Sequence, residues 1–344
     1  MVGGGCGRCV VEGDQEEVIR IGGGVDMRKE RKLVVEEIVR ASEEYGFFKV
    51  VNHGVSPHII SNMEEAAFSF FSQPFPSKTA FPTYGSNNIG FSGDLGHLEY
   101  LILHPTHYSS LFHYPSNFRS SVNEYIKAVR EVACEILEMM AEGVGVPNTW
   151  AFSALLRDHD SDSLLRLNHY PPLLPSHSSP SNSYNLGFGE HSDPQIITIL
   201  RSNDVHGLQI SLPDKGLWLP VSPDPSAFFV NVGDVLQFQC SNYCGFHRSV
   251  LNQSVQCFDW NLKVMTNGRF VSVRHRAVTN SHKSRMSMAY FGGPPLNACI
   301  VAPPEMVTPE RPSLYRPFTW AEYKQAAYSL RLGDNRIHHF RSST

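Results

Sequence analysis

The chain has 344 residues, 41% of them hydrophobic, which is enough to bury a large core and indicates one large globular domain. Its formal net charge of −4 is spread along the chain, so no basic patch indicates a nucleic-acid or membrane partner, and no pattern indicates an oligomeric state. No apolar run reaches the roughly 20 residues of a membrane span and no signal peptide is visible, so we expect a cytoplasmic protein and keep the nucleus open as an alternative.

The seven cysteines are an odd number in a chain without an export signal, so we expect free thiols rather than a disulfide framework. Cys6 and Cys9 have the spacing of half a zinc site. No second pair follows at the spacing of a zinc finger, so we expect residues 1–27 to be a flexible tail.

An amphipathic helix is predicted over residues 28–44, where apolar residues recur at helical spacing among charged ones. Gly46 ends this pattern, and the aromatic and β-branched run at 47–51 predicts a strand. Ser56-Pro57 is typical of an N-cap followed by proline in the first turn, so a second helix is predicted to begin here.

A third helix is predicted over residues 121–142. Before it, residues 74–114 have no sustained periodicity and predict long loops around one short strand at 98–103; loops this long are usually functional. Together these segments form a helical and mixed region over 28–163, whose helices we expect to support a sheet.

Residues 171–183 are rich in proline and serine and predict a linker. Beyond them, short apolar runs alternate with turn residues, which is typical of a β-sandwich or barrel. The expected strands span 196–200, 208–210, 218–221, 228–232, a stretch from residue 235 onward, 269–278 and 285–291. Residues 301–344 are expected to form a helix around 320–330, on the outside or at the mouth of this β-structure, and a tail.

A candidate metal site lies within the β-rich region. His191 and Asp193 form the one His-x-Asp pair of the chain, and His275 is a distant third ligand. Two imidazoles and one carboxylate on one face of a metal suit Fe(II), because three positions stay open for other ligands. With 16 histidines in the chain, a His-x-Asp pair can also occur by chance in a surface turn. The surrounding sequence must therefore decide between a metal site and a surface turn.

That context is a possible anion site ten residues beyond His275. Arg285 and Ser287 are two positions apart on a predicted strand, so their side chains point the same way. They can hold a carboxylate through a charge-assisted pair and a hydroxyl, and the phenol of Tyr170 could reach the same group. Arg-x-Ser alone carries no information, since it recurs at four other arginines.

With these motifs, the sequence resembles the plant 2-oxoglutarate and Fe(II)-dependent dioxygenases and, within them, the gibberellin 2-oxidases. The resemblance covers roughly residues 43–295. The stretches that carry it are 44–55, 164–172, 187–203 and 267–276.

The resemblance implies a mixed α/β protein dominated by β-structure, with a double-stranded β-helix, or jelly roll, as the catalytic core over 164–300. It implies that His191, Asp193 and His275 are the catalytic iron ligands. The implied cofactors are Fe(II), 2-oxoglutarate as cosubstrate and O2, with ascorbate as a candidate reductant.

The resemblance also implies that Arg285, Ser287 and Tyr170 hold the far carboxylate of 2-oxoglutarate. The expected partner is a small-molecule substrate, a gibberellin-like acid. The expected reaction is hydroxylation of its C-2 on the 2β face, which inactivates the hormone.

Two differences from related enzymes concern the substrate loop at 89–100. Related enzymes often carry a basic residue just before Ile89, where this chain has Asn87-Asn88, and an indole where it has His97. We expect His97 to be a loop residue bonded to backbone rather than a metal ligand. The differences keep open a dioxygenase of the same superfamily that acts on another small molecule, such as a flavonoid.

Residues 238–263 do not fit this pattern. Joined directly, 234–237 and 264–273 would form a hairpin with a tight turn at Asn267-Gly268. His275 follows Asp193 by 82 positions, and by 56 without the 26 residues of 238–263, which is the spacing that the resemblance leads us to expect.

We therefore interpret 238–263 as an insertion, either genuine or of the kind that an unspliced intron read in frame would produce. We expect it to loop out with the triad still assembled. Two alternatives stay open: a catalytically impaired product whose His275 does not reach the metal, and a zinc knuckle. The zinc knuckle would use Cys240, Cys244, His247 and Cys257.

Overall fold

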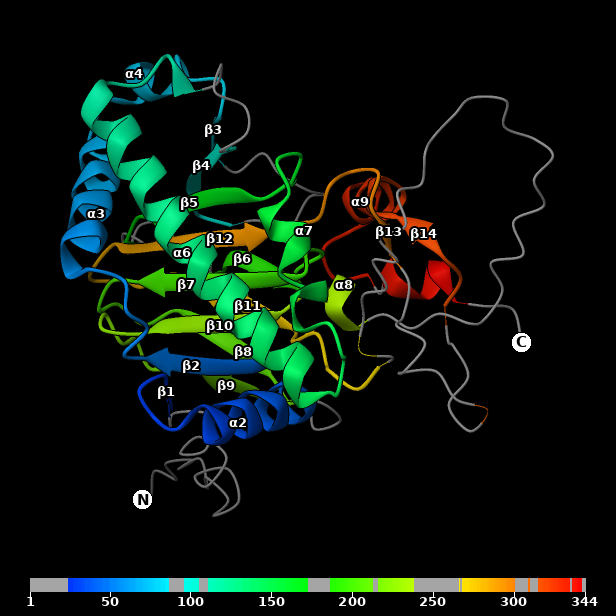
Figure 1. Ribbon diagram of the computed structural model, residues 1–344. Helices are drawn as coiled ribbons and strands as arrows, with labels where there is room; N and C mark the ends of the chain where they lie inside the picture. Colours follow the sequence, from blue (N-terminus) through cyan, green and yellow to red (C-terminus); the bar gives the residue numbers. More distant parts are fainter. Residues whose placement is uncertain are drawn as a thin grey trace, which may run out of the picture.

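The computed structural model of the protein describes residues 24–86, 96–104, 111–172, 186–212, 216–237, 266, 268–300, 309, 315–334 and 336–341. Two β-sheets pack face to face, helices cover the outer face of the larger sheet, and a small C-terminal layer lies beside one end of the sheets (Figure 1). Within the described ranges, no helix is long and apolar enough to cross a membrane.

The larger sheet has eight strands, and all its neighbouring strands are antiparallel except the first pair. In spatial order they are β1 (Val25–Asp26), β2 (Phe47–Val51), β10 (Phe228–Val232), β7 (Ile197–Ser202), β12 (Arg285–Gly292), β5 (Leu164–Tyr170), β4 (Glu99–Leu103) and β3 (Tyr84–Ser86). The central strands β7 and β10 are buried throughout, because helices cover one face of the sheet and the second sheet covers the other.

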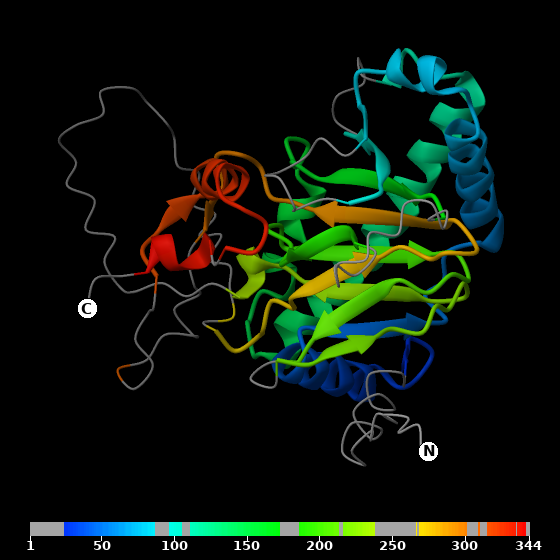
Figure 2. The same cartoon turned by 180° about the vertical axis from the view of Figure 1, so that it is seen from behind.

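The smaller sheet has four antiparallel strands: β6 (Leu186–His191), β11 (His275–Val278), β8 (Leu208–Ser211) and β9 (Trp218–Pro220). It lies on the side of the larger sheet that faces away from the helices (Figure 2). Leu200 and Phe229 of the larger sheet meet Ile210 and Leu219 of the smaller one in a shared apolar cluster. This two-sheet jelly roll with an added helical layer confirms the predicted fold class.

Three helices lie where the sequence periodicity predicts them: α2 (Arg31–Glu44), α3 (Pro57–Phe71) and α6 (Ser116–Gly143). α6 crosses the outer face of the larger sheet, and α2 and α3 pack against α6 (Figure 1). As predicted, Ser56 caps α3, because its Oγ accepts a hydrogen bond from the backbone N–H of His58 at 3.3 Å. Gly46 follows α2 with a φ of 63°, the left-handed conformation that favours glycine. Short helices η1 (Thr149–Ala151) and α7 (Ala154–Arg157) follow α6.

The prediction of loops throughout 74–114 is partly wrong. A short helix, α4 (Phe75–Thr79), precedes β3, which pairs with the predicted strand β4. Lys78 of α4 is buried and its Nζ donates to Glu99 Oε2 of β4 at 2.6 Å. A polar contact of this kind fixes the helix, and hydrophobic periodicity carries no sign of it.

The predicted strand from residue 235 onward is also wrong. Residues 234–237 form a helical turn, α8 (Asp234–Gln237), and β11 begins only at His275, so the described residues of the two flanks do not form the predicted hairpin. The backbone N–H of Asp234 donates to the carbonyl of Asp193 at 2.7 Å, which turns the chain inward. The carboxyl group of Asp234 then accepts hydrogen bonds from Ser272 and Tyr323.

The two flanks of 238–263 nevertheless lie side by side. Thr266 N donates to the carbonyl of Leu236 at 3.3 Å, and Gly268 N donates to the carbonyl of Gln237 at 3.0 Å. Residues 238–263 themselves, with the cysteines of the zinc-knuckle alternative, lie outside the described residues. So do Cys6 and Cys9 and most of the predicted linker, and these hypotheses stay predictions.

Two smaller expectations can be compared with the structure. Val25 and Asp26, which we expected in a flexible tail, pair in parallel with Val50 and Val51 of β2. This pairing moves the start of the ordered domain a few residues earlier. Cys134, which lies within the described residues, is a free thiol, as expected.

The C-terminal layer contains β13 (Cys299–Ile300), β14 (Phe318–Thr319), α9 (Trp320–Ser329) and η4 (Arg336–Phe340). Thr319 and Glu322 form a capping box at the start of α9. Trp320 anchors the helix, because its Nε1 donates to Asp162 Oδ2 at 2.8 Å. The helix predicted around 320–330 is therefore present and attached to the β-core.

Candidate active site

The end of β6 and the start of β11 bring the three predicted metal ligands together. His275 lies directly opposite His191 in the ladder, and Asp193 follows two residues after β6 ends. The Nε2 atoms of His191 and His275 lie 3.6 Å and 3.5 Å from Asp193 Oδ1. Because the three ligand atoms lie within 4.8 Å of one another, one metal ion could contact all of them.

Both imidazole rings are held with Nε2 toward this centre. His191 Nδ1 lies 2.7 Å from the carbonyl of Gly189, and His275 Nδ1 lies 3.2 Å from the carbonyl of Val273. A carbonyl oxygen can only accept, so each Nδ1 carries the hydrogen and each Nε2 keeps its lone pair. Metal-bound histidines use this arrangement, in which the second nitrogen fixes the tautomer and the ring.

Two side chains that the sequence did not reveal hold the carboxylate. Thr198 Oγ1 and Asn231 Nδ2 donate to Asp193 Oδ2 at 2.7 Å and 2.9 Å. Oδ1 of this buried carboxylate is thereby left to face the two histidines. Thr198 and Asn231 come from the neighbouring strands β7 and β10, so the larger sheet orients a ligand that the loop after β6 supplies.

The charges of the site suit a divalent cation. Burial and the neighbouring His275 lower the pKa of His191 well below its usual value, so this imidazole is neutral. Burial alone would raise the pKa of Asp193, but His275 and His191 and the bonds from Asn231 and Thr198 lower it. One carboxylate and two imidazoles in a triangle fit Fe(II), which accepts this donor set.

Arg285, Ser287 and Tyr170 line the same cavity as the triad, which we call the inner cavity. Arg285 and Ser287 are 2% and 1% exposed on β12, and the guanidinium carbon of Arg285 lies 5.2 Å from the centre of the Tyr170 ring. Arg285 Nε is buried, and none of the described residues accepts a hydrogen bond from it. A buried cation with an unused N–H fits a carboxylate ligand, and Ser287 beside it offers a hydroxyl.

His97 is exposed and takes no part in the triad. Its backbone N–H donates to the carbonyl of Leu186 at 3.1 Å, so the residue lies on a loop bonded to backbone, as expected. Asn87 and Asn88 lie outside the described residues.

A second pocket, of about 130 Å³, opens next to the triad, and we call it the outer pocket. Its walls combine apolar and polar side chains of the sheets and of the loop after β6 with residues of the C-terminal layer between Ala327 and Leu332 and with Arg336. The C-terminal layer therefore lies at the mouth of the jelly roll. The lining residues include Arg166, Phe188, Gln195, Tyr328, Leu332 and Arg336.

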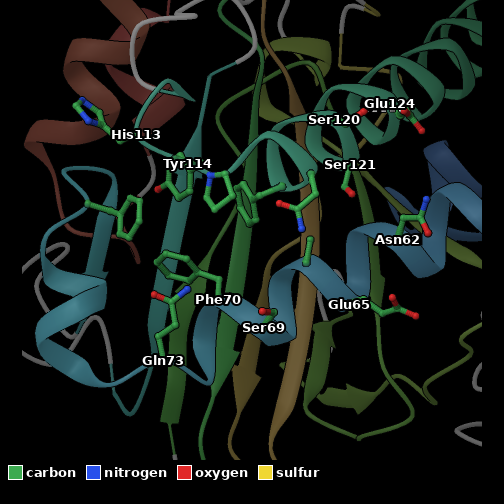
Figure 3. Close-up of a pocket in the computed structure, with 15 residues that line it drawn as sticks. Asn62, Glu65, Ser69, Phe70, Gln73, His113, Tyr114, Ser120, Ser121 and Glu124 are labelled. Carbon is green, nitrogen blue, oxygen red and sulfur yellow. Dashed lines mark hydrogen bonds between the residues drawn. The ribbon is translucent and has the colours of Figure 1, made fainter.

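A larger cavity of about 900 Å³ lies elsewhere, between α3 and the first turns of α6 (Figure 3). Asn62, Glu65 and Gln73 on one side and Ser120 and Glu124 on the other give it a polar rim. Among the described residues, metal donors cluster in the triad and in an exposed surface group at 158–160, and neither belongs to this cavity. Because neither cluster lies in this cavity, we do not assign it as the reaction site, although it is the larger one.

Comparison with known proteins agrees with this site. Residues 161–294 match the 2OG-Fe(II) oxygenase superfamily, and residues 17–100 match the family described as non-haem dioxygenase in morphine synthesis N-terminal. Gibberellin 2-beta-dioxygenase 4 of Arabidopsis thaliana is 47% identical over 331 residues, which are 92% of this chain and 94% of that protein. Gibberellin 2-beta-dioxygenase 2 of Oryza sativa subsp. japonica is 43% identical and covers 88% of this chain and 81% of its own.

Solved structures show the same architecture. The crystal structure of JOX2 in complex with 2OG, Fe and JA superposes with a TM-score of 0.75 at 27% identity, covering 93% of this chain and 89% of JOX2. The dioxygenase for auxin oxidation in rice shares the fold, with a TM-score of 0.68 at 24% identity over 94% of this chain and 98% of that chain. The chain belongs to the 2OG-Fe(II) oxygenase superfamily, whose reactions need Fe(II) and 2-oxoglutarate, and within it to the gibberellin 2-beta-dioxygenase family.

Proposed function

We propose that this Fe(II)- and 2-oxoglutarate-dependent dioxygenase hydroxylates gibberellins at C-2 on the 2β face and thereby inactivates the hormone. The proposal is supported by identities of 41–47% to curated gibberellin 2-beta-dioxygenases over most of the chain. The observation that carries it is one cavity in which two imidazoles, one carboxylate and a buried arginine converge.

His191, Asp193 and His275 are proposed to bind Fe(II) through two Nε2 atoms and Asp193 Oδ1. Their geometry supports this role, because every other polar atom of these side chains is already bonded to the protein. The bound iron, with 2-oxoglutarate and O2, supplies the oxidising power for hydroxylating an unactivated C–H bond. The protein fixes the ligands and aims one carbon of the substrate at the open metal positions.

Arg285, Ser287 and Tyr170 are proposed to hold the far carboxylate of 2-oxoglutarate. The unused N–H of Arg285 and the adjacent hydroxyl of Ser287 support this role. Gly207 leaves room for the arginine, because a Cβ there would lie 2.7 Å from Arg285 Cδ. The cosubstrate is thereby oriented from the β12 side of the cavity.

The test is product analysis with a panel of gibberellins, Fe(II), 2-oxoglutarate and ascorbate, the candidate reductant. We expect a 2β-hydroxylated product with one succinate released per hydroxylation. Turnover of a flavonoid but of no gibberellin would favour the second candidate, another dioxygenase of the superfamily, which the substitutions at Asn87, Asn88 and His97 keep open. The assembled triad speaks against a catalytically impaired product.

Action in the cytoplasm, with the nucleus as the alternative, can be tested by imaging a fluorescent fusion.

A further inference from the structure

Two buried arginines line the outer pocket together with apolar side chains, the polar residues His191 to Asp193 and Gln195. Arg166 and Arg336 are 8% and 4% exposed, and both line this pocket beside the triad. Burying a cation is costly unless its N–H groups find acceptors, so the partners of each guanidinium decide what it can do.

Arg166 is held in a fixed position but is not fully bonded. Its guanidinium lies between two rings, 4.5 Å from the centre of Tyr100 and 4.6 Å from the centre of Phe188. Its Nε donates to Asn168 Oδ1 at 2.8 Å. Its Nη2 is buried and has no acceptor among the described residues. The side chain is therefore oriented in advance, with one N–H group unused.

Arg336 shows the same pattern from the C-terminal side. Its Nη2 donates to the carbonyl of Leu332 at 3.1 Å, and its Nε is buried without an acceptor in the part of the chain that the structure describes. The carboxylate of Asp193 is the one anion among the described residues that line the pocket, and its oxygens already serve Thr198, Asn231 and the triad. The pocket thus offers two cations and no free anion.

We propose that Arg166 and Arg336 bind the carboxylate of the substrate, so that the outer pocket accepts an apolar carboxylic acid. The inference rests on the proposed function only in naming that acid a gibberellin. It gives this chain an anion-binding site on β5 and in the C-terminal layer. Such a site would take the place of the basic residue that related enzymes often carry just before Ile89, where this chain has Asn87-Asn88. Arg166 also borders the inner cavity, so its role must be separated from binding of 2-oxoglutarate.

The first experiment uses the unaltered enzyme with Fe(II) and 2-oxoglutarate, and compares a gibberellin free acid with its methyl ester. Esterification removes the negative charge and keeps the apolar skeleton. We expect kcat/KM to fall by about 10- to 100-fold for the ester, as for loss of a hydrogen bond to a charged group. Equal kcat/KM for the two compounds would overturn the proposal while leaving the proposed function intact.

The second experiment uses Arg166→Gln and Arg336→Gln, with the surface variant Arg157→Gln as control, since Arg157 forms an exposed ion pair with Glu131. Each pocket variant should raise the substrate KM for the acid and bring the acid-to-ester ratio of kcat/KM toward one. The cosubstrate KM, measured by substrate-free decarboxylation of 2-oxoglutarate, should stay unchanged. A raised cosubstrate KM with full acid selectivity would assign Arg166 to the cosubstrate instead. If a glutamine variant does not fold, the lysine variant and the ester comparison give the answer.

If neither the acid nor the ester of any gibberellin is turned over, the proposed function fails, and binding then tests the inference alone. The protein loaded with Mn(II) and 2-oxoglutarate is titrated with indole-3-acetic acid, an apolar monocarboxylic acid, and with its methyl ester. A Tm shift for the acid alone, lost in Arg166→Gln or Arg336→Gln, supports the anion site. Equal shifts, or none for the acid, contradict it.

Discussion

The inner cavity and the outer pocket lie next to each other but are built differently. In the inner cavity, the triad is fixed by hydrogen bonds from strands of both sheets, and each ligand atom has one orientation. The outer pocket takes one wall from the C-terminal layer, and the arginines in it keep unused N–H groups. We propose that this difference separates chemistry, which needs a rigid centre, from substrate recognition, to which the C-terminal layer contributes.

The largest effect is expected at the triad. Replacing His191, Asp193 or His275 by alanine should abolish 2-oxoglutarate turnover and metal binding, because a triad has no spare ligand. Mn(II) titration and succinate assays measure the two losses. His159→Ala, in the exposed cluster at 158–160, is the matched control and should change neither. Wild-type turnover in any triad variant would contradict the assignment.

The next effect is expected at Arg285, which lines the inner cavity from β12. Arg285→Ala should raise the cosubstrate KM by roughly 100-fold, corresponding to about 3 kcal/mol of charge-assisted hydrogen bonding. Arg285→Lys should raise it less, because lysine keeps the charge but loses the planar fork. Steady-state succinate assays measure both. Equal effects of the two changes would mean that Arg285 has a structural role.

The inner cavity could be predicted from the sequence for a physical reason. His191 and Asp193 are two positions apart, as are Arg285 and Ser287, so a single strand or turn already sets the relative direction of each pair. His275 needed the resemblance, because 82 positions separate it from Asp193. A β-sandwich or barrel was predictable from the alternation of short strands and turns, and the resemblance narrowed this expectation to the jelly roll.

The outer pocket could not be predicted in this way. Arg166 shares a strand face with Asn168 and Tyr170, and this spacing was the one local signal for it. Arg336 follows α9 in a segment with no pattern of its own. The turn at Asp234 was missed for a similar reason, because its buried bond to Tyr323 joins residues 89 positions apart. Contacts at that distance leave no periodic pattern.

A smaller effect should appear where the C-terminal layer joins the β-core. Tyr323 Oη donates to Asp234 Oδ2 at 2.6 Å, and burial raises the pKa of Asp234. Tyr323→Phe should cost about 1–3 kcal/mol of unfolding free energy, because it leaves this buried carboxyl short of a donor. Urea denaturation measures the loss. We also expect a higher substrate KM with an unchanged cosubstrate KM; an unchanged substrate KM would mean that the layer does not shape the outer pocket.

The buried carboxylate of Glu99 on β4 offers a test by pH. Burial alone would raise the pKa of Glu99, but bonds from His169, Lys78 and Tyr84 lower it from 4.5 to about 2. The stabilisation is therefore present at neutral pH and is lost as the pH falls below about 4.5 toward 2. Glu99→Gln should lower the unfolding free energy by about 1–3 kcal/mol at pH 7, and by progressively less below about pH 4. The exposed Glu65→Gln is the control, and a difference that is constant with pH would exclude the charge as the cause.

The smallest effect is expected from deleting residues 238–263, the segment that we interpret as an insertion. Its flanks are already joined by hydrogen bonds from Thr266 to Leu236 and from Gly268 to Gln237, so closing the chain there needs little rearrangement. Loop-closure entropy changes by only about 0.6 kcal/mol per doubling of length, so the deletion should stabilise the fold by about 1 kcal/mol or less. His275 lies beyond the flanks and is held by pairing with β6 and β8. The unaltered protein and the deleted protein should therefore have the same iron occupancy, and the deleted protein should be at least as active. Thermal unfolding and iron analysis of the two proteins provide the measurement. A deleted protein that is less stable, or that fails to bind iron, would show that 238–263 is an integral part of the fold and that the insertion hypothesis is wrong.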